Sequence, residues 1–388
     1  MPMRSLTLVG IIISMLTGLC LGVLVHLKNR IPAEQQSAKT INDAINQISN
    51  HYVESVSQET LSSHALKGMM QGLDEYSSFL DADEFRALQA TTTGKFGGIG
   101  VQLAVVDGFI TITRVTDGTP AADAGLIAQD RIIELNQHPA KGKLLTDIIS
   151  ELRGQPGTDV DLLIQRQDQK TPLVFKLMRA VIELKSVEGH LIAPGYGYVR
   201  IAHFQASTDD NLTQVLSQLH KQSPAGLHGL IIDLRNNPGG SLQGAVEVAD
   251  QFLDTGLIVT TKGRLNSKSA RYRATKGDAL NGKPIAVLIN GASASAAEIV
   301  AGALQDQGRA QVLGVQSFGK GSVQTLVPLT NAQALKITTA HYFTPNGHSI
   351  HDQGLTPDIV FEGSENELLE KAMNWLKSRK IDIVPGQL

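Results

Sequence analysis

Residues 284–304 read PIAVLINGASASAAEIVAGAL. The run from Pro284 to Ile289 is apolar throughout and has the length of a buried strand, and the apolar residues at 299, 300, 303 and 304 have helical spacing. The stretch therefore predicts a strand that turns into a helix, with Ser295 at the turn. Backbone N–H groups converge at the start of a helix, where they can stabilise the oxyanion of a tetrahedral intermediate.

Ser295 has a structural interpretation as well as a catalytic one. Ser295 and Glu298 form an S-x-x-E pattern, which is typical of a helix capping box. The catalytic interpretation needs a base, and Lys320 in the glycine-rich loop 318–321 is the candidate. A lysine acts as a base only where burial lowers the pKa of its amine from ~10.4 toward neutrality. We expect the flanking Phe318 and Val323 to help bury this loop.

A histidine base is the alternative within the same reaction class. The chain has 11 histidines, including His203 and His341. His348 and His351 follow the turn at 345–347 and are interpreted as solvated loop residues, because a metal site normally needs three or four ligands. No H-E-x-x-H pattern occurs, so neither a metal nor a cofactor is expected.

Composition sets limits on the class of protein. The chain has 388 residues, 42% of them hydrophobic and 18% charged, which suits a globular protein of two or three domains. A net charge of −3 and a single tryptophan give no reason to expect nucleic-acid binding. The only cysteine is Cys20, so the folded body has no intrachain disulfide and no thiol nucleophile.

Residues 5–27 carry no formal charge and are rich in Leu, Ile and Val. This length is enough for a membrane helix, which needs roughly 20 residues, whereas the apolar region of a cleaved signal is about 7 to 15 residues long. The segment predicts an uncleaved anchor, and a cleaved signal is the alternative. We expect the body to lie on the periplasmic side of a bacterial inner membrane, because long downstream domains are translocated largely regardless of charge.

The rest of the chain has three different patterns. Residues 37–93 are helical, with an apolar stripe at 41, 44, 45 and 48 and a compact turn at 72–80. The next segment has a glycine-rich stretch, strands at 109–115, 131–135 and 159–166, and a helix at 145–152. From about Val181, buried strands alternate with helices, and strand 229–234 turns into a helix at Gly239-Gly240. The two strand-turn-helix units suggest an α/β core in which both turns face one cleft.

The segment after residue 94 resembles a PDZ domain of the bacterial protease type. In such a domain a glycine-rich loop, here Gly97, Gly98, Ile99 and Gly100, exposes backbone amides to the carboxylate of a peptide C-terminus. The adjoining strand accepts the peptide as an additional strand. A glycine-containing hairpin without a ligand is the alternative interpretation of these residues.

Five motifs occur together in this chain, at 73–80, 229–240, 291–298, 318–324 and 354–359. Their order and spacing resemble those of the carboxyl-terminal processing peptidases, which are serine endopeptidases with an inserted PDZ domain. The resemblance covers residues 37–362. It implies that Ser295, and not Ser293, is the nucleophile, that Lys320 is the base and that Gln324 supports it. It also implies an oxyanion hole formed by the backbone amides of Ala296 and Gly240.

The sequence thus favours a Ser-Lys endopeptidase that acts on polypeptides with exposed apolar C-termini. A membrane-tethered PDZ scaffold without activity and a crotonase-like acyl-CoA enzyme are the alternatives. The tail helix at 365–380 is expected to pack on the core or to form an oligomer contact. The partners considered besides the substrate are a second copy of the chain and a regulatory adaptor. The expected fold class is α/β, with a crotonase-like core and the following parts: a membrane segment at 1–30, a helical arm at 31–93, a PDZ domain at 94–182, a peptidase core at 183–362 and a helical tail at 363–388.

Overall fold

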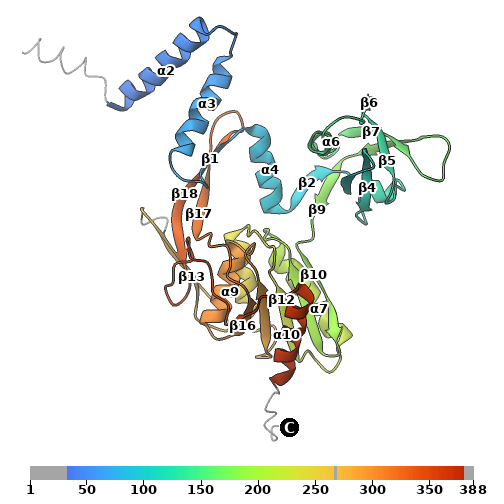
Figure 1. Ribbon diagram of the computed structural model, residues 1–388, viewed down its shortest axis with the longest axis vertical. Helices are drawn as coiled ribbons and strands as arrows, with labels where there is room; N and C mark the ends of the chain where they lie inside the picture. Colours follow the sequence, from blue (N-terminus) through green and yellow to red (C-terminus); the bar gives the residue numbers. More distant parts are fainter. Residues whose placement is uncertain (1–32, 266–268, 380–388) are drawn as a thin grey trace, which may run out of the picture. The chain divides into compact units, whose positions relative to one another are not determined.

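The protein is described by a computed structural model that covers residues 33–265 and 269–379 (Figure 1). The chain divides into two compact units, with the division between Phe79 and Leu80. The expected anchor at 5–27 lies outside the described residues. In the part of the chain that is described, every helix is too short or too polar to cross a bilayer.

The first unit contains the paired helices α2 (Ala33–His51) and α3 (Gln58–Gln71). Both confirm the helical pattern expected from the sequence. The apolar stripe of α2 is not a core stripe, however, since Ile41 is 42% exposed and Ile48 is 45% exposed. Strand β1 (Ser78–Leu80) follows a tight turn in which the Asp74 carboxylate accepts hydrogen bonds from the backbone N–H groups of Tyr76 and Ser77.

Helix α4 (Ala82–Thr93) leads into the PDZ-like segment. It begins with a capping box formed by Asp81 and Glu84, and it ends at Gly94, whose φ of 72° is left-handed. A two-stranded ribbon then joins β2 (Lys95–Gly98) to β9 (Ala180–Glu183). The expected glycine loop at 97–100 is therefore partly wrong, because Gly97 and Gly98 pair with Val181 and Ala180 inside this ribbon.

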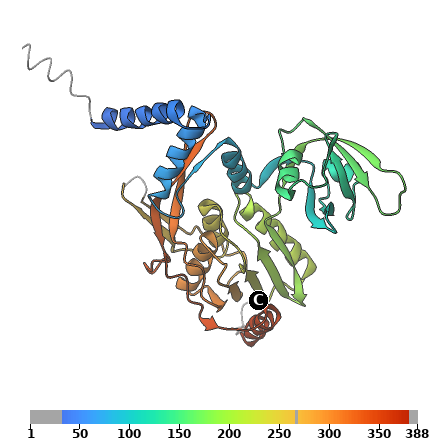
Figure 2. The same ribbon diagram turned by 45° about the horizontal axis from the view of Figure 1, so that its top comes forward.

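The PDZ-like body is a sheet of order β3-β4-β5-β7-β8, with β6 paired to β5 (Figure 2). Ile112, Leu135, Ile148 and Ile164 are fully buried in its core, so this segment has a hydrophobic core of its own. Strand β3 lies at the edge of the sheet beside α6. The elements are β3 (Val101–Val106), β4 (Phe109–Val115), α5 (Pro120–Asp123), β5 (Arg131–Leu135), β6 (His138–Pro139), α6 (Leu145–Leu152), β7 (Asp159–Gln165) and β8 (Leu173–Met178).

A six-stranded sheet of order β10-β11-β12-β15-β16-β19 forms the centre of the remaining chain. β10 is antiparallel to β11, and all other neighbours are parallel. The two strand-turn-helix units expected from the sequence are confirmed as β12 with α8 and β15 with α9. The elements are β10 (Val187–Ala193), β11 (Tyr196–Ile201), α7 (Thr208–Gln222), β12 (Gly229–Asp233), α8 (Leu242–Asp250), β15 (Ile285–Ile289), α9 (Ala296–Asp306), β16 (Ala310–Gly314) and β19 (Ile359–Val360).

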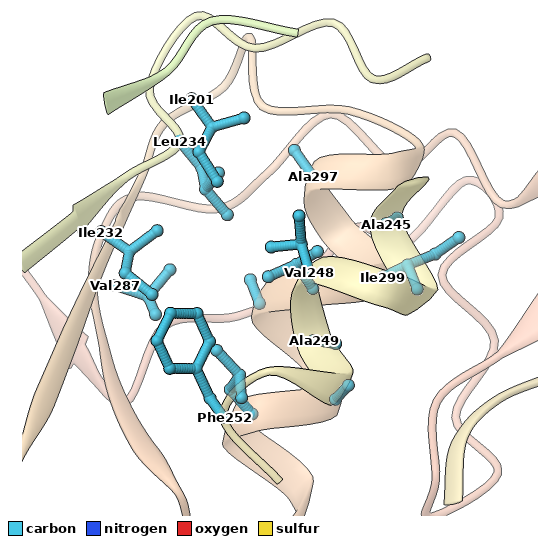
Figure 3. Close-up of a cluster of buried hydrophobic side chains, with 14 of the residues drawn as sticks. Ile201, Ile232, Leu234, Ala245, Val248, Ala249, Phe252, Val287, Ala297 and Ile299 are labelled. Atoms are coloured by element: carbon cyan, nitrogen blue, oxygen red, sulfur yellow. The ribbon is translucent and has the colours of Figure 1, made fainter. Parts of the chain in front are cut away.

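Both faces of this sheet are covered, as expected for parallel strands that are apolar throughout. Residues of β12 and β15 alternate between two cores: Ile232 and Val287 pack against α8 and α9, whereas Ile231 and Leu288 lie in the core with α10 (Glu365–Ser378). Figure 3 shows the first core, with Phe252 and Val248 filling the space between the sheet and the two helices. The buried residues Leu368, Ala372 and Leu376 confirm that the tail helix packs on the core.

A second sheet lies beside α9 and consists of antiparallel strands. β18 (Ala334–Phe343) pairs with β17 (Ser322–Pro328) and with β13 (Leu257–Gly263), and β13 pairs with β14 (Ala270–Arg273). One face of this sheet is part of the core, since Val259 and Tyr342 are buried there. Side chains alternate along a strand, so the residues between them point to the other face.

Candidate active site

Three turns leave the same edge of the central sheet. β12, β15 and β16 are parallel and in register, so their carboxyl ends meet at one edge. The segments that follow them, at 234–241, 290–295 and 315–321, are also joined to one another. Ala294 N–H donates to the carbonyl of Asn237 over 2.9 Å, and Phe318 N–H donates to the carbonyl of Ser293 over 3.0 Å. The two turns that were expected to face one cleft therefore lie against each other, and the loop after β16 joins them.

Ser295 lies immediately before α9 in a strained backbone conformation. Its φ is 55° and its ψ is −115°, which a residue with a side chain adopts at a cost of about 1–3 kcal/mol. Ser293, the other serine of the motif, is fully buried, and its hydroxyl donates to the carbonyl of Leu234 over 2.8 Å. The Ser295 hydroxyl donates to no carbonyl or carboxylate of the described residues. Ser293 thus has a structural role, and Ser295 is the accessible hydroxyl.

Glycine is required where the turn after β12 approaches Ser295. A Cβ atom at Gly239 would lie 2.6 Å from Ser295 Cβ, and one at Gly240 would lie 2.0 Å from the carbonyl oxygen of Phe204. Both glycines also have positive φ. Asn237 fixes the turn: its side-chain amide donates to Ile201 O, and its Oδ1 accepts from Gly239 N–H, each over 2.8 Å. The sequence pattern indicated the glycines but not the role of Asn237.

Two backbone N–H groups beside Ser295 make no hydrogen bond within the described parts of the chain. They belong to Ala296, which is the first residue of α9, and to Gly240. The N–H of Gly239, in contrast, is used by Asn237. A first-turn N–H of a helix has no partner within the helix, so it is available to a ligand.

Glu298 joins the Ser295 turn to the Lys320 loop. Its Oε2 accepts from the backbone N–H of Ser295 over 2.7 Å and from that of Lys320 over 3.0 Å. Its Oε1 accepts from the hydroxyl of Ser317 over 2.5 Å and from the N–H of Gly319 over 2.8 Å. Capping the helix at Ser295 is therefore only part of what Glu298 does, because it also binds the Lys320 loop. The sequence signalled the contact with Ser295 but not the three donors from the distant loop.

The Glu298 side chain is fully buried and fully hydrogen-bonded. Four donors, two to each oxygen, match the acceptor capacity of an ionised carboxylate. Burial raises the pKa of this carboxyl, and the hydrogen bonds from Ser317, Gly319, Ser295 and Lys320 act in the opposite direction. A protonated carboxyl would turn one acceptor site into a donor facing an N–H or O–H group, so the ionised form fits this network.

The surroundings of Lys320 differ in part from expectation. Val323 packs against the core, but Phe318 is 58% exposed, so the expected burial by Phe318 is wrong. Lys320 itself is half-buried. Gln324 lies on β17, and its amide donates to the hydroxyls of Ser322 over 2.9 Å and Thr338 over 3.3 Å. The motif residue Leu355 helps to hold the loop, since its N–H donates to Ser317 Oγ over 2.6 Å.

The histidines occupy three different environments. Burial lowers the pKa of His203, whose ring contacts the Gln205 amide. His341 and His351 pack ring against ring, with centroids 4.5 Å apart. Their Nδ1 atoms are buried and have no partner among the described residues, so the interpretation of His351 as a solvated residue is wrong. His348 is exposed, as expected. Within the described ranges, no three His, Cys, Asp or Glu side chains are grouped as metal ligands.

The peptide-binding residues expected in the PDZ-like body are split between two places. Gly97 and Gly98 belong to β2, and a Cβ at Gly97 would lie 1.9 Å from Gly154 O. Ile99 and Gly100 form the short link to the edge strand β3, and their carbonyls accept from Ala121 and Thr116. Their N–H groups donate to no acceptor of the described chain. This link and β3 are therefore the part that can still bind a peptide end.

Comparisons with known proteins agree with this architecture. Residues 195–361 match the model of peptidase family S41, residues 97–177 match a PDZ domain, and residues 24–84 match the activating protease CtpB N-terminal domain. A carboxy-terminal-processing protease of Bartonella bacilliformis is 40% identical over 333 residues, which are 85% of this chain and 76% of that protein. Carboxy-terminal processing protease CtpB of Bacillus subtilis is 36% identical over 330 residues, 83% of this chain and 67% of that protein.

Among solved structures, a photosystem II D1 C-terminal processing protease is 27% identical, with a TM-score of 0.49. The match covers 88% of this chain and 97% of the solved chain. The α/β core with its inserted PDZ domain is that of a serine-type peptidase. The chain belongs to the carboxy-terminal processing proteases of peptidase family S41.

Proposed function

We propose that this peptidase cleaves polypeptides with a Ser-Lys dyad, in which Ser295 is the nucleophile and Lys320 is the general base. The observation that carries the proposal is the shared hydrogen bond to Glu298: the backbone N–H groups of both residues donate to the same carboxylate oxygen. Two residues whose backbones lie within ~3 Å of one oxygen are close enough for their side chains to meet. The strained turn at Ser295 supports the same assignment.

The chemistry follows from these positions. Ser295 Oγ attacks the peptide carbonyl while neutral Lys320 takes the hydroxyl proton, which gives a tetrahedral intermediate. The N–H groups of Ala296 and Gly240 hold its oxyanion. Protonated Lys320 then gives its proton to the leaving amine, and the acyl-enzyme forms. Water attacks the ester by the reverse proton path, releasing the acid product and free Ser295. Gln324 is assigned to positioning Lys320, as the family resemblance implies.

The PDZ domain is assigned to holding the C-terminus of the substrate. The edge strand β3 has an unpaired side that can accept an extended peptide, and α6 lies beside it. The N–H groups of Ile99 and Gly100 would bind the terminal carboxylate. The half-buried apolar side chains Leu103 and Leu145, which pack on this body, favour an apolar last residue. Substrates are therefore polypeptides with exposed apolar C-termini.

We also propose where in the cell this peptidase acts. An apolar, uncharged segment at 5–27 would anchor the chain in the bacterial inner membrane, with the body on the periplasmic side. Release after signal cleavage is the alternative. The half-exposed stripe of α2 at Ile41 and Ile48 gives a homo-oligomer a surface to use. A regulatory adaptor protein is a second partner that we propose.

The experiment that tests this function uses an unfolded protein with an apolar C-terminus. The full-length chain should cut it, and the Ser295→Ala variant should not. Amidation of the substrate C-terminus should slow cleavage by about tenfold, because it removes a charge-assisted contact with the backbone amides. Fragments are compared by mass spectrometry. Cleavage by the Ser295→Ala variant at the wild-type rate would contradict the assignment of Ser295 as the nucleophile. Cleavage of the amidated and unmodified substrates at the same rate would contradict recognition of the C-terminal carboxylate.

A further inference from the structure

Two asparagine side chains bridge the turns that carry the proposed oxyanion hole and the proposed nucleophile. Asn236 lies in the turn after β12, which leads to Gly240, and Asn290 begins the turn after β15, which leads to Ser295. The Asn236 N–H donates to Asn290 Oδ1, and the Asn290 side-chain amide donates to Asn236 Oδ1, each over 3.0 Å. This asparagine bridge is reciprocal, because each turn contributes one donor and one acceptor.

Asn290 also shapes the turn in which it lies. Its Oδ1 accepts a second N–H, from Ala292 over 3.1 Å, and its own backbone N–H donates to Ser293 Oγ over 2.9 Å. An amide oxygen has two lone pairs, so the two N–H donors use the acceptor capacity of Asn290 Oδ1. One side chain therefore fixes both the shape of the Ser295 turn and its position against the Gly240 turn.

Two further hydrogen bonds join the same turns at a buried position. The Ser293 hydroxyl donates to Leu234 O over 2.8 Å, and Ala294 N–H donates to Asn237 O over 2.9 Å. These groups are buried, whereas the asparagine bridge lies at an exposed position. The two turns are thus fastened at two separate places, and a second attachment limits rotation of one turn against the other.

The separation of the two turns matters for the proposed chemistry. The oxyanion would be held by Ala296 N–H from one turn and by Gly240 N–H from the other, while Ser295 Oγ forms the new bond. The turns approach closely, since a Cβ atom at Gly239 would lie 2.6 Å from Ser295 Cβ. An oxyanion hole that is divided between two turns keeps its geometry only while the turns keep their separation.

We propose that Asn290 is a positioning residue for this oxyanion hole, and that it acts by holding the Gly240 turn, through Asn236, against the Ser295 turn. The inference rests on the proposed function, because it takes Ser295 as the nucleophile and Gly240 as an oxyanion donor. Asn290 itself contacts no reacting atom. Asparagine suits this position because its short side chain has both an acceptor oxygen and a donor amide.

Asn290→Ala removes the bridge and should lower the rate of the chemical step. A displacement of about 1 Å in reacting groups can lower a rate about 10²-fold, so we expect kcat to fall at least about tenfold and KM to change by less than about twofold. The full-length chain is assayed on an unfolded substrate. Affinity for a peptide boronate should fall by the same factor as kcat/KM, because the boronate adduct occupies the oxyanion hole.

Two other variants separate the bridge from a general structural role. Asn236→Gly removes the acceptor of the Asn290 amide but keeps the N–H bond to Asn290 Oδ1, and glycine readily adopts the φ of 59° at this position. We expect it to lower kcat about two- to threefold. The double variant Asn236→Gly/Asn290→Ala should be no slower than Asn290→Ala, because both changes remove the same bridge.

Asn290→Asp is the conservative variant. Its carboxylate still accepts from the N–H groups of Asn236 and Ala292, so it should recover most of the rate that Asn290→Ala loses. The matched control is Asn211→Ala, which changes a half-buried asparagine of α7 and should cleave at close to the wild-type rate.

Hydrogen exchange measures the bridge without catalysis. Asn290→Ala should exchange faster at residues 235–241 and 290–295, while β12 and β15 keep their protection. Wild-type kcat in Asn290→Ala, or faster exchange spread over the whole core with no recovery in Asn290→Asp, would overturn the inference and leave the peptidase function intact. A wild-type chain that forms no boronate adduct at Ser295 would instead contradict the proposed function, and the inference with it. If Asn290→Ala did not fold, Asn236→Gly would decide by the same two measurements.

Discussion

Lys320→Met is expected to abolish cleavage while the fold is kept. Methionine keeps the unbranched stem and removes only the amine, so packing of the loop should change little. Loss of the general base should lower kcat by about 10³-fold or more, which corresponds to about 4 kcal/mol of transition-state stabilisation. The measurement is the rate of cleavage of an unfolded substrate, together with circular dichroism and binding of a C-terminal peptide to the PDZ domain.

Matched controls separate this result from other causes. Lys336→Met changes another half-buried lysine, on β18, and should cleave at close to the wild-type rate. His203→Asn and His341→Asn should also retain activity, because neither histidine is the base in this account. Activity that survives in Lys320→Met and disappears in one of the histidine variants would replace the dyad with a Ser-His pair.

Glu298→Gln is expected to lower kcat by about 10²-fold with little change in KM. The amide has one acceptor oxygen and one NH₂ group, so it cannot accept all four donors that the carboxylate accepts. The Ser295 turn and the Lys320 loop would then separate, and a shift of about 1 Å in catalytic groups can lower the rate about 10²-fold. Steady-state kinetics on the purified variant provide the measurement.

Ser317→Ala is the structural control for this change. It removes one donor to Glu298 Oε1 and the acceptor of the Leu355 N–H, and it leaves the two bonds from Ser295 and Lys320 to Oε2. We expect a loss of kcat of less than about tenfold, because each lost hydrogen bond adds only about 0.5–1.5 kcal/mol of stability and both bonds to Oε2 are kept. If Ser317→Ala lost as much kcat as Glu298→Gln, the carboxylate would be a general support and not a link between the two catalytic residues.

The pH dependence of Glu298 has a defined sign. Burial raises the pKa of its carboxyl above the ordinary value of 4.5, so the folded protein binds this proton more tightly than the unfolded chain does. This group therefore adds stability at low pH, and that contribution is lost as pH rises through the raised pKa. Activity follows the opposite direction, because the ionised form holds the catalytic loops. Protonation of Lys320 lowers kcat on acidification in both proteins, so the wild-type chain should show a second, steeper loss at lower pH where Glu298 is protonated, and Glu298→Gln should show only the limb of Lys320.

The local part of the site could be predicted from the sequence. The apolar run at 285–289 and the helical spacing after Ser295 were sufficient for the strand-turn-helix unit, because both patterns are formed by neighbouring residues. The parallel register of β12 and β15 then brought their turns together, as expected for an α/β core. The pattern S-x-x-E correctly gave the contact between Glu298 and Ser295.

Contacts between distant segments could not be predicted in this way. The donors from Ser317, Gly319 and Lys320 reach Glu298 only when the loop that follows β16 in the chain folds against the start of α9. Gly97 and Gly98 became strand residues because β9, more than eighty positions later, pairs with them. The bridge between Asn236 and Asn290 likewise joins residues 54 positions apart, and composition alone does not specify such a contact.

The most direct test of the dyad is a crystal structure of the protein with a peptide boronate. We expect a bond from Ser295 Oγ to boron and a boronate oxygen about 2.7–3.1 Å from the N–H groups of Ala296 and Gly240. We also expect Lys320 Nζ to lie about 2.6–3.2 Å from Ser295 Oγ. An adduct on another residue, or a Lys320 amine that points away from the boron-bound Ser295, would contradict the account.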